Sequence, residues 1–126
     1  MGGSRPIELK KRVTMKSKSE IQSIVEAIKR FRDERDWGKF HDAKNLTIGL
    51  SVEAAELLEV FLWNNPDEIK LERFKEELAD VFYFAFLLAD HFQLDVGQLV
   101  REKLKQNAKK YPVEKSRGSK KKYDEI

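Results

Sequence analysis

Apolar residues recur at helical spacing along four stretches of the chain. From residue 21 to residue 31 they fall three or four positions apart, which is the pattern of an amphipathic helix. Ser19 followed three residues later by Gln22 has the form of a capping box and marks the start of this stretch. We therefore expect a first helix over residues 19–35.

Three further helices, each as long as the first or longer, are expected after it. The second starts near residues 42–45 and ends at Trp63, and the turn at Asn65-Pro66 separates it from a third helix over about 70–92. The fourth is capped by Asp95 and runs to about Lys110. No stretch alternates with a period of two, so no strand is expected. The pattern predicts an all-α, four-helix bundle-like protomer with short connections.

Two pairs of carboxylates lie on the apolar faces of the second and third helices. The members of a pair are three residues apart, just under one turn, so they project from the same side. A carboxylate on a core-facing stripe costs several kcal/mol unless its charge is compensated, and these stripes carry no matching basic residues. The pattern predicts a hard divalent cation, Mg²⁺ with Mn²⁺ as a substitute, held by oxygen ligands. The predicted metal ligands are Glu53, Glu56, Glu77 and Asp80.

Other readings of the acidic pairs fit the sequence less well. A ferritin-like di-iron site needs Glu-x-x-His on two helices, and neither His41 nor His91 lies three residues after a glutamate. A zinc site is less well supported, because the chain has no cysteine to act as a ligand. The simplest alternative is that the acids are solvated helix faces, and two pairs on apolar stripes count against it.

The fourth helix and several aromatic residues supply groups that suit a nucleotide. Lys103, Asn107 and Tyr111 are four residues apart on one face and can hold phosphate oxygens. Aromatic faces stack on nucleobases, and an imidazole can hydrogen-bond a base edge. The candidate base-binding residues are Trp37, His41, Trp63 and Phe84. Taken singly, each of these would more simply be a core or capping residue.

The two ends of the chain are basic and its centre is acidic. Residues 1–20 carry six Lys or Arg against two acids and residues 109–126 carry seven against three, so each end is +4; with a net charge of +3, the centre is −5. We expect a basic N-terminal extension (1–18), a helical domain (19–113) and a basic C-terminal tail (114–126). An acidic centre does not resemble a nucleic-acid groove, so nucleic acid is not an expected partner.

The remaining composition favours a cytoplasmic protein. There is no cysteine and no apolar leader at the start, and the apolar run over residues 81–89 is too short to span a bilayer, so no membrane partner is expected. A thin helical protomer of this size often completes its core by association. We therefore expect a homodimer or a homotetramer.

In order and spacing, these residues resemble the MazG-like all-α nucleoside triphosphate pyrophosphohydrolases, and most closely their dCTP pyrophosphatase branch. The resemblance covers residues 20–113. In that branch a tryptophan, a histidine and a second tryptophan frame the base, and Trp37, His41 and Trp63 fall at the corresponding places. Phe84 stands where the branch often has a tyrosine. The segments that carry the resemblance are Phe40-His41-x3-Asn45-Leu46, Glu53-x2-Glu56-Leu57, Phe61-Leu62-Trp63, Glu76-Glu77-Leu78-Ala79-Asp80-Val81 and Lys103-x3-Asn107-x3-Tyr111-Pro112.

The resemblance implies Mg²⁺-dependent hydrolysis of a (deoxy)nucleoside triphosphate, dCTP or a modified dCTP, to the monophosphate and pyrophosphate, in nucleotide pool cleaning. Glu53 or Glu56 would act as the catalytic group that orients or deprotonates the attacking water. Members of the group assemble as dimers or as tetramers. Two alternatives stay open: an enzyme like a phosphoribosyl-ATP pyrophosphohydrolase, and a helical interaction module without catalysis.

Overall fold

The computed structural model describes residues 18–126, and within them the chain is all-α, without a strand. The basic N-terminal extension predicted over 1–18 lies, apart from Lys18, outside the described residues. The four predicted long helices are present, and three short helical turns accompany them. The elements are α2 (Glu20–Glu34), η1 (Gly38–Phe40), α3 (Ala43–Leu62), η2 (Pro66–Glu68), α4 (Leu71–His91), α5 (Val96–Lys110) and α6 (Val113–Ser116).

Side-chain caps set the starts of three helices. Ser19 and Gln22 form the predicted capping box, in which the Ser19 hydroxyl accepts from the Gln22 backbone N–H at 3.1 Å and Gln22 Oε1 accepts from the Ser19 N–H at 3.0 Å. Asp42 caps α3 and Asp95 caps α5, each accepting a backbone N–H three residues on. Each such cap stabilises its helix by about 1 kcal/mol. Local chemistry therefore accounts for the starts of three of the four long helices.

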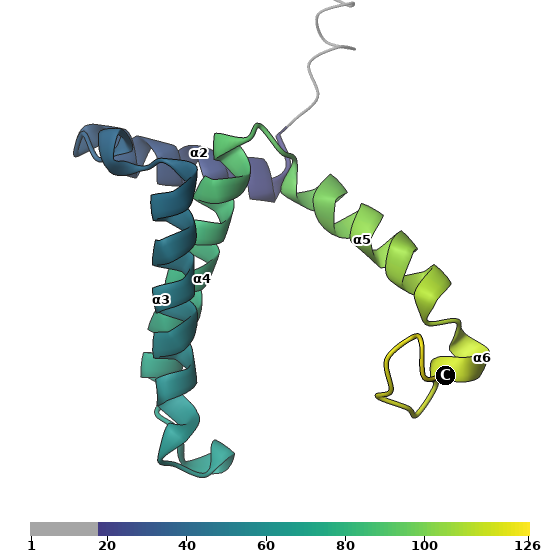
Figure 1. Cartoon of the computed structure of the whole chain (residues 1–126). Helices are drawn as coiled ribbons and strands as arrows, with labels where there is room; N and C mark the ends of the chain where they lie inside the picture. The colour runs from purple at the N-terminus through teal and green to yellow at the C-terminus, as the bar shows by residue number, and fades with distance from the viewer. Residues whose placement is uncertain (1–17) are drawn as a thin grey trace, which may run out of the picture.

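Helices α3 and α4 form an antiparallel hairpin that is the main body of the chain, and α2 crosses one end of it (Figure 1). Leu46 of α3 and Leu87 of α4 are each only 2% exposed at the centre of the small core. Gly49 lets the two helices approach closely, because a Cβ there would lie 2.5 Å from Cε1 of Phe84. This contact allows the close approach of α3 and α4 at the level of Gly49.

Helix α5 points away from the α3–α4 hairpin (Figure 1), so the four long helices do not close into a bundle within one chain. The all-α prediction is confirmed. The structure differs from the predicted bundle-like protomer in that α5 points away from the other long helices. About half of the surface of several large apolar side chains remains exposed as a result, among them Ile48, Val52, Phe82, Leu99 and Leu104. Across residues 18–126, no helix has the length and apolar character needed to cross a membrane.

Candidate active site

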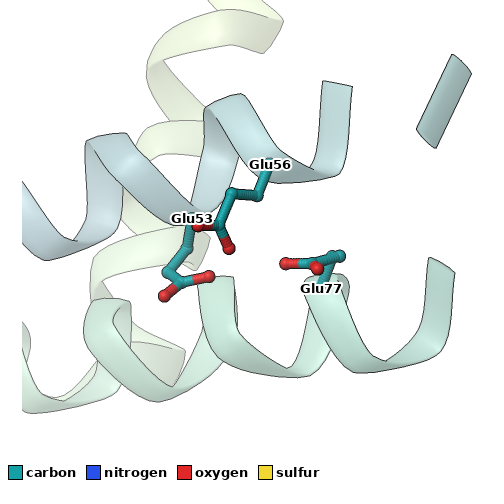
Figure 2. Close-up of side chains that lie close together, drawn as sticks. All are labelled: Glu53, Glu56 and Glu77. Carbon is teal, nitrogen blue, oxygen red and sulfur yellow. The ribbon is translucent and has the colours of Figure 1, made fainter. Parts of the chain in front are cut away.

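Three glutamates meet between α3 and α4. Glu53 and Glu56 extend from α3 and Glu77 extends from α4, and Figure 2 shows their carboxylates turned toward one another. One carboxylate oxygen of each lies within 4.8 Å of the corresponding oxygens of the other two. The antiparallel hairpin thus brings together three of the four predicted metal ligands, from both acidic pairs.

None of the three glutamates forms an ion pair within residues 18–126, since the nearby Arg73 pairs with Glu59 and only opposes the raised pKa of Glu77 from a distance. Oε2 of Glu53 and Oε2 of Glu77 are buried, and neither has a hydrogen-bond partner within residues 18–126. Burial, followed by the neighbouring Glu56, raises the pKa of Glu53 to about 7 and also raises the pKa of Glu77. Orphaned carboxylate oxygens in a shared cluster are the donor set that a hard divalent cation prefers. The residues present therefore fit such a cation.

Asp80 lies at the edge of this cluster and not within it. Its side chain is exposed, whereas the apolar stripe predicted a buried one. Its charge still acts on the site, since it contributes to the raised pKa values of Glu53 and Glu77. Whether Asp80 binds metal stays a prediction.

A cavity of about 520 Å³ lies beside Asp80, between α2, the turn before η1 and α4. Its walls are mostly apolar and aromatic, and two of the predicted base-binding residues, Trp37 and Phe84, belong to them. Phe31 and Tyr83 were not predicted for this site. Tyr83 is three residues after Asp80, so its place on the same side of α4 was a signal available in the sequence. The lining residues are Ile24, Ala27, Ile28, Phe31, Trp37, Asp80, Tyr83 and Phe84.

The expected frame of Trp37, His41 and Trp63 does not form within one chain. His41 precedes α3 and Trp63 ends it, and a helix of 20 residues separates its ends by ~30 Å. Trp63 is 90% exposed. His41 is half-buried with no hydrogen-bond partner for Nδ1 in the described part of the chain, and burial, then the charge of Arg32, lowers its pKa.

The predicted phosphate-binding residues also lie away from the acids. Lys103 and Asn107 belong to α5 and Tyr111 is its C-cap, and α5 points away from the α3–α4 hairpin (Figure 1). The ring of Tyr111 instead packs edge-on against Tyr123 in the C-terminal tail, with 6.2 Å between centroids. Within one chain, the structure does not join these residues to the glutamate cluster.

Two antiparallel helices that present glutamates to each other define an all-α protein with an acidic site suited to a cation. The model of the MazG-like family matches residues 48–126 of this chain. The chain belongs to the MazG-like family.

Individual relatives agree with this membership. The chain is 36% identical over 119 residues to dCTP pyrophosphatase 1 of Bos taurus, an alignment that spans 87% of this chain and 70% of that protein. It is also 36% identical over 104 residues to dCTP pyrophosphatase 1 of Homo sapiens, spanning 76% of this chain and 61% of that protein. A solved pyrophosphatase structure from Archaeoglobus fulgidus superimposes with a TM-score of 0.71 and 32% identity, covering 78% of this chain and 97% of that one.

Proposed function

We propose that this chain hydrolyses dCTP or a modified dCTP to the monophosphate and pyrophosphate, with Mg²⁺ as cofactor. Its family and its pyrophosphatase relatives make it a nucleoside triphosphate pyrophosphohydrolase. The observation that carries the metal dependence is the cluster of Glu53, Glu56 and Glu77, whose carboxylates converge and leave two buried oxygens without a hydrogen-bond partner in the described part of the chain.

The three glutamates, with Asp80 beside them, would hold the cation. When bound, Mg²⁺ supplies charge neutralisation at the phosphate oxygens and acidifies a coordinated water. A carboxylate of Glu53 or Glu56 orients the attacking water and takes its proton. The water attacks the α-phosphorus, the bond from that phosphorus to the bridging oxygen breaks, and pyrophosphate leaves with the bond electrons.

One observation supports a cytosine nucleotide, and a second supports a binding place for a base of any kind. Relatives that match over most of this chain are dCTP pyrophosphatases. The aromatic cavity that contains Trp37 and Phe84 also contains Asp80, which acts electrostatically on Glu53 and Glu77. A triphosphate held at the glutamates can therefore extend its base toward aromatic walls, which stack on bases.

A second copy of the chain would complete the site and the core. Lys103 and Asn107 lie on α5, which points away from the α3–α4 hairpin, and Trp63 is 90% exposed, so a neighbouring subunit could receive them. The large apolar side chains left half exposed on α3, α4 and α5 give such an assembly a surface to bury. We propose a homodimer or homotetramer with active sites near subunit boundaries.

A turnover panel tests the proposal. Pyrophosphate release is measured over the common NTPs and dNTPs with Mg²⁺ and with a chelator, for the wild type and for Glu56→Gln. We expect release from dCTP with Mg²⁺, and a loss of at least ~100-fold in kcat for Glu56→Gln. Glu59→Gln is the matched control, because Glu59 lies on the same helix, is exposed and pairs with Arg73 at 3.8 Å. Full activity of Glu56→Gln, or release of phosphate in place of pyrophosphate, would contradict the proposal.

A further inference from the structure

We propose that α5 of one copy of the chain lies in an apolar groove of a second copy and there brings Lys103 and Asn107 to the glutamate cluster of that second copy. The inference rests on the proposed function, because it names the docking surface that completes the same site. The contact is parallel: α5 and the α3 that receives it run in the same direction.

The groove lies along the first half of α3 and the last turns of α4. Its volume is about 810 Å³, and its walls are mostly apolar. Ile48 and Val52 line it from α3 and are 51% and 49% exposed, and Leu88 and Phe92 line it from α4. Among the described residues of α5, only Leu99 borders it. A groove of this kind suits an amphipathic helix that covers its apolar walls.

Helix α5 carries a face that matches the groove. Successive helical residues advance by about 100°, so five residues of α5 share about 140° of its circumference. Three of them are apolar, Leu99, Val100 and Leu104, and are 47%, 52% and 60% exposed. The other two are Lys103 and Asn107. The described part of the chain therefore leaves this face largely uncovered.

The order of groups is the same along α3 and along α5. Each helix presents apolar residues first and polar groups of the site second. Glu56 lies eight residues after Ile48 on α3, and Asn107 lies eight residues after Leu99 on α5; eight helical residues span ~12 Å. With Leu99 beside Ile48 of the second copy, Asn107 reaches the level of Glu56. Lys103 then lies one turn earlier, where its charge faces phosphates held at the glutamates.

The turn after α4 directs α5 away from its own groove. Gln93 has a φ of 56°, in the left-handed region. Its N–H donates to the Asp90 carbonyl at 2.9 Å, and the N–H of Leu94 donates to the Ala89 carbonyl at 2.9 Å, which is the pattern that closes a helix end. Helix α5 then leaves the α3–α4 hairpin (Figure 1). Because every copy has both a groove and an α5, two copies can exchange these helices about a two-fold axis.

Mixed assemblies test whether Lys103 acts on the glutamates of another copy. Glu56→Gln and Lys103→Ala are each expected to lose at least ~10-fold in kcat/KM for dCTP. The two variants are coexpressed with different tags and purified through both tags in sequence. In a mixed pair, one site then has wild-type residues at both positions and the other site has both changes. We expect at least about one quarter of the wild-type turnover to return.

A crosslink tests the register without using hydrolysis. The chain has no cysteine, so Val52→Cys and Leu104→Cys can be made in separate copies that carry tags of different size. On mixing and oxidation, we expect a disulfide-linked dimer that contains both tags. Leu71→Cys in place of Val52→Cys is the control, because Leu71 is 57% exposed and lies at the other end of the hairpin, where no linked product should form.

Each outcome decides one part of the inference. Mixed assemblies without recovered turnover would show that Lys103 acts within its own chain and would overturn the exchange. Failure of the two tags to purify together, as expected if a different protein covers the groove, would overturn it as well. A missing crosslink between positions 52 and 104 would overturn the parallel register. The crosslink without any pyrophosphate release by the wild type would instead refute the proposed function and leave the docking of α5 in place.

Discussion

Replacing Glu53 with glutamine should stabilise the metal-free protein at alkaline pH. Burial, then Glu56, raises the pKa of Glu53 in the folded chain from 4.5 to about 7. Below pH 4.5 the folded and unfolded chains both hold this proton, so the side chain does not lower the free energy of unfolding. Between pH 4.5 and about 7 only the unfolded chain releases it, so the free energy of unfolding falls as the pH rises, and above about pH 7 the loss is constant.

The size of the effect follows from the same pKa values. At about 1.36 kcal/mol per pH unit, the full difference would be ~3.4 kcal/mol. Because the residue is only half-buried, screening by water reduces this, and we expect ~1–2 kcal/mol. Glu53→Gln should therefore be more stable than the wild type by that amount at pH 8, and within ~0.4 kcal/mol of it at pH 4.5.

The assay is urea unfolding followed by circular dichroism, with a chelator present and at one protein concentration, since assembly makes stability depend on concentration. Glu59→Gln is the control and should shift stability little at either pH, because its ion pair is exposed. Adding Mg²⁺ at pH 8 should stabilise the wild type and have a smaller effect on Glu53→Gln. The reasoning is refuted if Glu53→Gln gains the same stability at both pH values, or loses stability at pH 8.

Three further predictions concern activity, assembly and the core. Asp80→Ala should abolish turnover with unchanged helical circular dichroism, because its charge acts at the glutamate cluster; full activity would remove Asp80 from the site. Light scattering at micromolar concentration should give the mass of a dimer or tetramer, and a stable monomer mass would contradict the proposed assembly. Leu87→Ala should lower the free energy of unfolding by ~2–5 kcal/mol, since Leu87 is 2% exposed; the exposed Leu71→Ala should cost far less, and equal losses in urea titrations would contradict this account.

Helix positions followed from the sequence because the signals that set them are local. The capping box at Ser19 and the caps at Asp42 and Asp95 depend on residues three positions apart. The direction of α5 depends on the turn after His91 and on what packs against it, and neither has a local signature. The position of Lys103 relative to the acids depends on the direction of α5, so residue spacing alone could not predict it.

The candidate site was predictable in part for the same reason. The three-residue spacing within Glu53/Glu56 correctly placed both side chains on one face of α3, and the hairpin brought Glu77 to them. The exposure of Asp80 depends on how α4 is rotated against α3, which periodicity gives only approximately. The separation of His41 from Trp63, by contrast, was calculable in advance, because both flank one continuous predicted helix.

The close approach of Gly49 to Phe84 has a consequence for how mutational data on this chain are interpreted. Gly49 lies four residues before Glu53 on α3, and Phe84 lies four residues after Asp80 on α4. Any side chain at position 49 forces the helices apart or makes them slide, and the carboxylates one turn away move with them. A saturation screen scored by turnover would therefore rank this residue with the catalytic acids, although it has no functional group. Phe84 also lines the aromatic cavity, so a smaller residue at position 84 should restore kcat at saturating substrate, without restoring KM, if the contribution of Gly49 is mechanical alignment.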